Sequence, residues 1–230
     1  MQLDHTVQKS NYILEGEAIL NSVLLKNSSW FKENHSVHFF KKEEKIYSPN
    51  DPSNNIYMIA EGRVKISAAD PDGKNTIKAI FGENDVFGEM ALTGEKNRTD
   101  SATALEDNTK IFTLTESEVL EMMRENTQIS SQILSILGAR IKRTEKRLES
   151  LLHKDARTRI IDFLRDLAIE KGRKIGFETF IKNYFTHKDM ASLTGTSRQT
   201  VTTVLNELKE KNIINFDRRR ILIRDMDLLV

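Results

Sequence analysis

The chain has 230 residues, of which 38% are hydrophobic and 30% are charged, a composition typical of a globular protein that can bury a core. It has no cysteine, which excludes disulfides, thiolate catalysis and cysteine-ligated iron–sulfur clusters and agrees with a reducing cytoplasm. Its apolar runs are too short to cross a membrane and its N-terminus lacks the pattern of a signal peptide, so we expect a cytoplasmic protein without a membrane partner.

The net charge of +1 is divided unevenly along the chain. Residues 153–230 carry 16 Lys and Arg against 11 Asp and Glu, a net charge of +5, so residues 1–152 carry −4. A basic C-terminal part hints at an anionic partner, although a charge of this size is also common on solvated surfaces.

The N-terminal part changes its sequence texture near residue 37. Residues 13–34 are predicted to form short helices in which Trp30 and Phe31 are packing anchors. Residues 37–115 contain short β-branched and aromatic runs, separated by turn signals such as those at 70–73. This spacing predicts an antiparallel barrel or roll of roughly eight strands.

From Glu116 the chain is predicted to be helical for about forty residues. Apolar or neutral residues recur there in steps of three and four, forming a heptad seam: Leu134, Leu137, Ile141, Thr144, Leu148 and Leu151. A lone helix would leave these leucines in water, so we expect it to pair with the same helix of a second subunit. The alternative is that the seam packs on its own barrel.

A break at residues 154–155 separates this helix from a C-terminal region. An amphipathic helix is predicted over 156–171, followed by a glycine-bearing loop with a short strand or hairpin. The segment THKDMASLTGTSRQTVTTVLNELKEKNII then covers residues 186–214. Thr186 and Asp189 form a capping box that begins one helix, and Ser197 can cap a second.

The same segment has the spacing that a helix-turn-helix requires. Ala191 is small where two helices touch, Gly195 supplies the positive φ of a tight turn, and Val201 wedges the second helix against the first. Residues 213–223 then predict a β-hairpin with a basic tip, which is a wing.

The second helix presents short polar and basic side chains near its N-terminus. Arg198 can contact guanine with two hydrogen bonds, and Gln199 can pair with adenine. Thr202 and Thr203 suit a thymine methyl group or a phosphate. The candidate DNA-binding residues are Thr186, Ser197, Arg198, Gln199, Thr200, Thr202, Thr203, Arg218 and Arg219. The alternative for each is a solvated surface residue.

A β-roll, a long dimer helix and a winged helix-turn-helix, in this order, resemble the CRP/FNR family of bacterial transcription regulators, named after the cyclic AMP receptor protein. The phrases NNIYMIAEGRVKI, FGEMAL and TSRQTVTTVLNELKEKNII are the most family-like, and the resemblance covers about residues 20–224. It implies an α+β fold with a cyclic-nucleotide-binding-like antiparallel β-roll (a jelly roll) over 1–125, a dimerisation helix over 126–153 and a winged helix-turn-helix over 154–230.

The resemblance implies a homodimer that binds a palindromic double-stranded DNA operator, contacts RNA polymerase and is controlled by a small effector in the β-roll. It implies a regulator and not an enzyme, and no metal-ligand cluster or nucleophile–base pair points to catalysis. The alternatives are a family member with a non-nucleotide effector or with none. A cyclic-nucleotide-binding module that regulates another protein is a weaker alternative.

In nucleotide-binding members, a Gly-Glu-x-small-Leu stretch leads to an arginine followed by small or hydroxyl residues. By resemblance, Arg98 would pair with a cyclic phosphate and Glu89 would accept from the ribose 2′-OH. Backbone N–H groups of residues 88–91 and the hydroxyl of Thr99 would add donors. The implied effector residues are Gly88, Glu89, Met90, Ala91, Arg98, Thr99, Thr144 and Glu145. The alternative is a Glu89–Arg98 ion pair that braces a loop.

Several residues depart from the pattern of the nucleotide-binding members. Thr144 matches a threonine that contacts the adenine amino group, but Glu145 replaces a serine. Asp100 occupies a slot that is usually neutral, and a carboxylate pointing inward there would repel an anion. Glu43 and Asn50 replace common glycines. The expected effector is therefore cyclic AMP or another cyclic nucleotide, with its identity open, and no metal or iron–sulfur cluster is expected.

Overall fold

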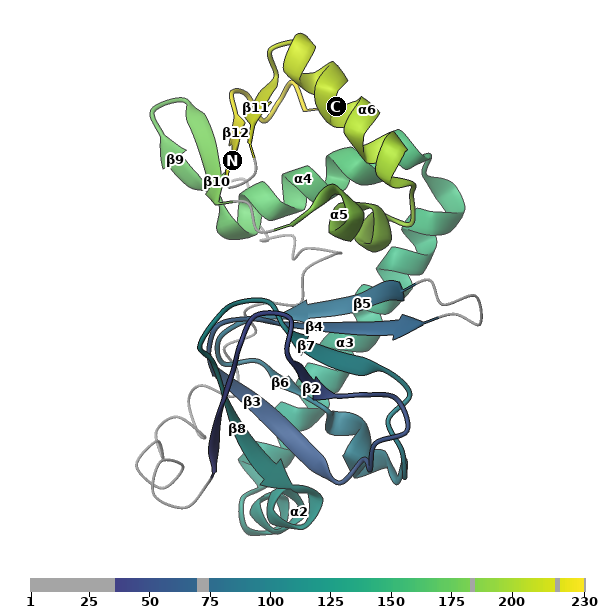
Figure 1. The fold of residues 1–230 in the computed structure, drawn as a ribbon, viewed down its shortest axis with the longest axis vertical. Helices are drawn as coiled ribbons and strands as arrows, with labels where there is room; N and C mark the ends of the chain where they lie inside the picture. Colours follow the sequence, from purple (N-terminus) through teal and green to yellow (C-terminus); the bar gives the residue numbers. More distant parts are fainter. Residues whose placement is uncertain (1–35, 70–74, 183–184, 218–219, 230) are drawn as a thin grey trace, which may run out of the picture. The chain divides into compact units, whose positions relative to one another are not determined.

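The structure is a computed structural model that describes residues 36–69, 75–182, 185–217 and 220–229. Its helices and strands form two compact units, one that ends at Ile141 and one that begins at Lys142 (Figure 1). The predicted helices over 13–34, the turn at 70–73, and Arg218 and Arg219 lie outside the described residues.

The first unit contains an antiparallel β-roll built from two four-stranded sheets (Figure 1). One sheet has the order β1-β8-β3-β6 and consists of β1 (Val37–Phe40), β8 (Thr109–Thr115), β3 (Asn55–Glu61) and β6 (Val86–Phe87). The other has the order β2-β7-β4-β5 and consists of β2 (Lys45–Tyr47), β7 (Ser101–Ala104), β4 (Val64–Ala69) and β5 (Asn75–Phe81). The predicted roll of short strands is confirmed.

Two helices follow the roll: α2 (Glu116–Glu125) and α3 (Thr127–His153). The stretch predicted to be helical from Glu116 is divided at Asn126, where the chain leaves helical geometry with φ −135° and ψ 104°. The Oδ1 atom of Asn126 accepts a hydrogen bond from the backbone N–H of Gln128 at 2.9 Å, so this residue caps the start of α3.

Strand β3 buries side chains on both of its faces. Tyr57 and Ile59 face the core between the two sheets, while Ile56 and Met58 face the core beneath α2 and α3. This alternation follows from the two-residue repeat of a strand. Each fully buried aliphatic side chain contributes about 1.5–3 kcal/mol relative to an exposed one, so these two cores stabilise the roll and fix its loops.

Helix α3 has two apolar faces. Ile129, Ile133 and Ile136 pack against the roll, whereas the seam residues Leu134 and Ile141 are 67% and 61% exposed. The alternative that these two seam residues pack on their own barrel is therefore wrong. An exposed apolar stripe with this repeat is what a second copy of the helix would cover.

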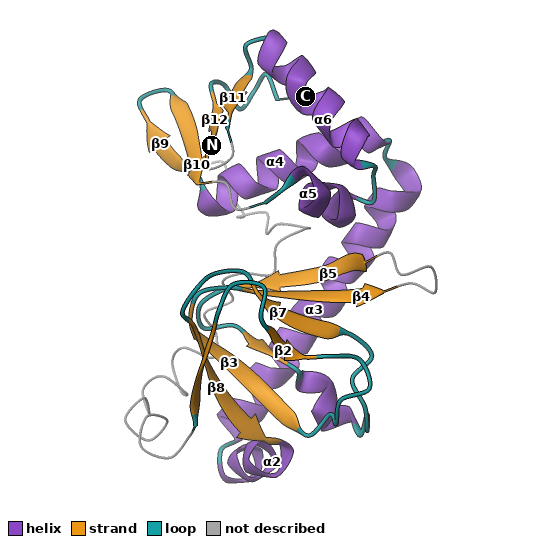
Figure 2. Ribbon diagram, in the orientation of Figure 1, coloured by secondary structure: helices purple, strands orange, loops and turns teal. Residues whose placement is uncertain are grey.

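The second unit begins within α3 and continues as a winged helix-turn-helix (Figure 2). Its helices are α4 (Ala156–Lys171), α5 (His187–Thr194) and α6 (Arg198–Glu210). Its antiparallel sheet has the order β11-β12-β10-β9 and consists of β9 (Arg173–Ile175), β10 (Glu178–Lys182), β11 (Ile214–Phe216) and β12 (Arg220–Ile223). The helix predicted over 156–171 and the two predicted hairpins are confirmed.

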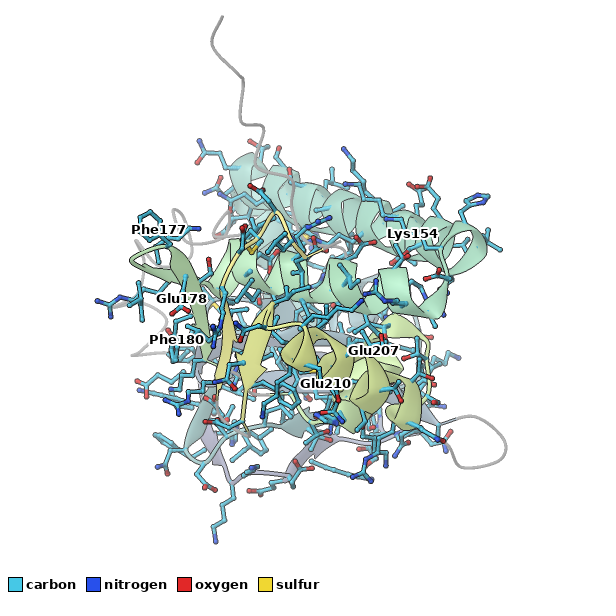
Figure 3. The ribbon with its side chains drawn as sticks, turned by 90° about the horizontal axis from the view of Figure 1, so that it is seen from above. Lys154, Phe177, Glu178, Phe180, Glu207 and Glu210 are labelled. Atoms are coloured by element: carbon cyan, nitrogen blue, oxygen red, sulfur yellow. The ribbon has the colours of Figure 1, made fainter. Side chains whose placement is uncertain are left out.

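The core of this unit lies between α4, α5, α6 and the sheet. Its fully buried side chains include Ile160, Phe163, Leu164, Leu193, Val201, Leu208, Ile181 and Ile223. Phe177 at the tip of the β9–β10 hairpin is 98% exposed and points away from this core (Figure 3), so the tip adds no packing. None of the helices in the described part of the chain is long and apolar enough to cross a bilayer.

Candidate DNA interface and effector site

The turn between α5 and α6 is held by the contacts that its sequence predicts. Thr186 Oγ1 accepts from the N–H of Asp189 at 3.1 Å, and Asp189 Oδ2 accepts from the N–H of Thr186 at 2.9 Å, which completes the capping box. Gly195 ends α5 with φ 62°. A Cβ atom there would lie 2.6 Å from Leu151 Cδ2, the end of a side chain that can shift, so the backbone angle is the main reason for glycine.

The start of α6 is capped by Ser197, whose Oγ accepts from the backbone N–H of Thr200 at 3.0 Å. The hydroxyl groups of these two residues are also 2.8 Å apart. The side chains of Thr186, Ser197 and Thr200 therefore already fix the two helix starts. Their predicted contacts with DNA stay a prediction.

Helix α6 has a buried face and an exposed face. Val201, Val204, Leu205 and Leu208 lie in the core. On the opposite side, three predicted reading residues are exposed near the N-terminus of the helix: Arg198, Gln199 and Thr203. The structure thus brings these three together on one rigid surface.

Thr202 differs from the other predicted reading residues. Its side-chain Oγ1 donates to the carbonyl oxygen of Arg198 at 2.9 Å and lies 2.9 Å from His187 Nδ1. The hydroxyl proton is therefore engaged inside the protein, and only the methyl group and one oxygen lone pair remain for a DNA contact.

Six of the eight implied effector residues lie on the connection between β6 and β7. Gly88, with φ 79°, precedes a 3₁₀ helix, η2 (Glu89–Thr93). A Cβ atom on Gly88 would lie 3.0 Å from Tyr57 Cδ2 and 3.1 Å from the Asn55 carbonyl oxygen. Only glycine meets both the angle and the space, so the Gly-Glu start of this segment has a structural cause.

Arg98 is turned into the protein, where it is only 4% exposed. Its Nη1 donates to the Gly88 carbonyl oxygen at 3.0 Å, and its Nη2 donates to the Asn55 carbonyl oxygen. Its Nε is buried without a hydrogen-bond partner. A guanidinium has five N–H donors, so an anion that reached this site would find donors still to satisfy.

Two arginines lie over a cluster of four aromatic rings: Tyr47, Tyr57, Phe81 and Phe87. The Arg98 Cζ atom lies 4.5 Å from the centroid of the Tyr47 ring, and the Arg140 Cζ atom lies 4.6 Å from that of Phe81. Such contacts stabilise a desolvated cation. The faces of these aromatic rings therefore stabilise both guanidinium groups near the Gly88 segment.

Glu89 forms an ion pair with Arg140 of α3, and Arg140 also donates to the Val86 carbonyl oxygen. The Glu89 and Arg140 side chains are only 19% and 16% exposed. The alternative of a Glu89–Arg98 ion pair is wrong, because each residue has a different partner. The carboxylate that we expected to face a ribose thus joins the roll to α3 within the first unit.

Asp100 is neutralised by a partner that the sequence did not reveal. Its Oδ2 atom lies 2.9 Å from Lys78 Nζ, and it accepts a hydrogen bond from the Tyr47 hydroxyl. Burial raises the pKa of Tyr47 far above its usual value, and the negative charge of Asp100 raises it further, so Tyr47 stays a donor. The repulsion that we expected from Asp100 is therefore reduced by Lys78.

The other implied effector residues of this segment differ in their exposure. Ala91 is buried, whereas Met90 and Thr99 are exposed. A cavity of about 40 Å³ lies behind the segment, between β3, β8, α2 and α3. Its walls are apolar apart from Glu89 and Arg140, so it offers few partners to a phosphate. An anion is therefore better served on the Arg98 side.

Comparison with known proteins decides the family. A model named "Cyclic nucleotide-binding domain" matches residues 37–126, and one named "Crp-like helix-turn-helix domain" matches residues 158–230. The chain belongs to the CRP/FNR family of transcription regulators.

Relatives of this CRP/FNR chain match most of its length. The "CRP-like cAMP-activated global transcriptional regulator" of Mycobacterium tuberculosis is 28% identical over 190 residues, which are 83% of this chain and 84% of the relative. The "Global nitrogen regulator" of Nostoc sp. is 29% identical over 188 residues, 81% and 84% of the two chains. The solved structure of a CooA mutant from Carboxydothermus hydrogenoformans is 25% identical, covers 97% of this chain and 96% of its own, and gives a TM-score of 0.77.

Two effector residues that the CRP/FNR resemblance implies lie on α3 beyond the first unit. Thr144 and Glu145 are both exposed in the single chain. In a twofold coiled coil the seam position of Thr144 would be covered by a second copy. Their contact with a base stays a prediction.

Sequence reasoning missed Arg140 and Arg159. Arg140 shares a helix face with Ile133 and Ile136, and a charge on a face that packs against a core needs a buried partner, which was the available signal. Arg159 donates to the carbonyl oxygens of Thr194 at 2.8 Å and of Gly195 at 3.1 Å, so it braces the turn of this CRP/FNR helix-turn-helix. No sequence pattern announced that role.

Proposed function

We propose that this chain is a homodimeric transcription regulator that reads a palindromic DNA operator with α6 and is controlled by a small anionic effector in its β-roll. The observation that carries the proposal is the exposed surface of Arg198, Gln199 and Thr203, backed by a fully packed helix face. An α-helix with such a surface fits the major groove, where the arginine fork matches guanine.

Dimerisation is supported by the seam of α3. Leu134, Ile141 and Leu148 are exposed apolar residues in the heptad register. Pairing with a second copy would remove them from water and place two α6 helices about a twofold axis. The operator would then be palindromic, with half-sites about 10 bp apart.

The DNA-reading proposal is tested with an operator selected from a random duplex library. Arg198→Ala is expected to weaken binding to that operator by about tenfold to a hundredfold while weak nonspecific binding remains, because a bidentate guanine contact is lost. Arg173→Ala, which removes an exposed arginine on β9, is the matched control and should leave discrimination unchanged. Unchanged operator affinity of Arg198→Ala in a gel shift would refute the assignment.

A cyclic nucleotide is the first candidate for the effector. The buried and unpartnered Nε of Arg98 supports an anion, and the segment that begins η2 contacts Arg98 through the Gly88 carbonyl oxygen. The name of the M. tuberculosis relative includes activation by cAMP. We infer that a cyclic phosphate would take Arg98, with Glu89 and the dimer residues Thr144 and Glu145 contacting the rest.

A non-nucleotide effector is the second candidate. Glu89 is occupied by Arg140, and Asp100, Tyr47 and Lys78 make the site more polar than a purine requires. A smaller anion could use Arg98 and Lys78 without displacing Glu89.

Calorimetry of the purified protein with cyclic AMP and cyclic GMP separates these candidates. Binding of either nucleotide that is lost in Arg98→Lys supports the first candidate. Arg63→Lys changes another buried arginine, paired with Glu106 elsewhere in the roll, and should leave binding intact. No heat with either nucleotide would favour the second candidate.

The proposed function also covers the regulator's protein partner, its location and its lack of enzymatic activity. We propose that the regulator contacts RNA polymerase, acts in the cytoplasm and has no catalytic activity. Release of AMP from cyclic AMP by the pure protein would contradict the last point.

A further inference from the structure

His187 begins α5 and touches α6 next to the reading residues. Its Nδ1 atom lies 2.9 Å from Thr202 Oγ1, whose proton is donated to the carbonyl oxygen of Arg198 at 2.9 Å. A hydroxyl has one proton, so when Thr202 donates to Arg198 it accepts from His187, which assigns the neutral ring its proton on Nδ1. In this assignment a chain of two hydrogen bonds ends at the first residue of α6.

The His187 ring is half-buried against the wing. Its centroid lies 6.0 Å from that of Phe216 on β11. The ring thus contacts the recognition helix through Thr202 and the wing through Phe216. Removing the ring would therefore remove the contact with Thr202 on the recognition helix and the contact with Phe216 on the wing.

The positive charge of Arg198 acts on this ring from α6. Lys209, also on α6, has its Nζ 5.4 Å from the centroid of the neighbouring Phe216 ring. On α5 itself Lys188 is adjacent, and the Asp189 carboxylate is occupied by the capping box. Burial lowers the pKa of His187 below its usual 6.5, and the charge of Arg198 lowers it further, so the ring is neutral near pH 7.

We propose that His187 is a positioning residue for DNA reading by α6 and that operator binding is accompanied by uptake of a proton on this ring. The inference rests on the proposed function, because it requires α6 to lie against DNA. Phosphates drawn to the start of α6 would offset the charge of Arg198, which favours the imidazolium.

The sign of the pH dependence follows by linkage. The pKa of His187 is below 6.5 in the free protein, and on this proposal it is higher in the DNA complex. Binding therefore takes up a proton at pH values between the two pKa values. Affinity therefore rises as pH falls through that window, by at most about tenfold per pH unit, and is independent of pH above it.

The test measures fluorescence anisotropy of the selected operator and of a scrambled duplex at constant ionic strength between about pH 5.8 and pH 8. His187→Asn keeps a donor near the Nδ1 position but cannot titrate in this range. It should match the wild type at the upper pH and lose the rise in affinity at the lower pH. His187→Leu removes the donor as well and should lose about fivefold in discrimination at every pH.

His153→Asn is the matched control, because His153 is an exposed histidine on α3 in the same unit, and it should keep the wild-type pH profile. Far-ultraviolet circular dichroism and melting temperature check the folding of each variant. A His187→Asn profile that rises like the wild type would overturn proton uptake, and unchanged discrimination by a folded His187→Leu would overturn positioning. A wild type with no operator preference would instead defeat the proposed function.

Discussion

The DNA-reading surface and the effector segment use their arginines in opposite ways. Arg198 is exposed on α6, and the core behind it holds the helix in place. Arg98 is buried, and its guanidinium donates to the Gly88 and Asn55 carbonyl oxygens. DNA is a long anionic polymer, and a surface whose side chains are in place before binding can contact it. A small effector must instead bind within a hydrogen-bond network that already supports the fold. Its binding energy can therefore shift the equilibrium between conformations of the protein.

The largest expected effect comes from truncating these two arginines. Arg98→Ala should lower the free energy of unfolding of its unit by about 3 kcal/mol, because two carbonyl oxygens lose their donors and a cavity forms. Arg198→Ala should change it by less than about 0.5 kcal/mol, as is usual at an exposed position. Urea unfolding measures both. Equal stabilities of the two variants would break the comparison.

The Glu89–Arg140 ion pair belongs to the buried network around the effector segment, which it joins to α3. Glu89→Gln should cost about 2 kcal/mol by leaving a mostly buried guanidinium unpaired. A double-mutant cycle with Arg140→Gln should give a coupling of about 1–2 kcal/mol. The more exposed Lys154–Asp162 pair of the second unit, at 2.7 Å, is the control and should give less than about 1 kcal/mol. Similar couplings for both pairs would contradict the account.

The smallest effect concerns the turn that supports the DNA-reading helix. Gly195→Ala should cost about 1.5 kcal/mol, because it adds a displacement of the Leu151 side-chain end to the strain of a positive φ. Gly176→Ala is the matched control, since its φ is 61° and nothing lies within 4 Å of the added Cβ. It should cost only about 1 kcal/mol. Thermal melting compares them, and equal losses would show that the Leu151 contact does not matter.

The helix-turn-helix could be predicted because its determinants are close together in the sequence. Thr186 and Asp189 cap one helix, Ser197 caps the next, and Gly195 makes the turn between them. Each role depends on backbone geometry within a few residues. The predicted order of roll, long helix and winged motif was confirmed for the same reason, since strand and helix repeats are local signals.

The effector segment could be predicted only in part. The spacing of Gly88, Glu89 and Arg98 was visible, but their partners lie far away along the chain. Arg98 and Asn55 are 43 residues apart, and Lys78 is 22 residues from Asp100. No repeat in the sequence indicates that two residues so far apart are in contact.

We expect two copies, paired through the α3 seam, to read a mirrored duplex with α6. Selection of bound duplexes from a random library, followed by sequencing, tests this expectation. The result should be an enriched palindrome whose half-sites are about 10 bp apart. An enriched site without twofold symmetry, or no enrichment at all, would contradict it.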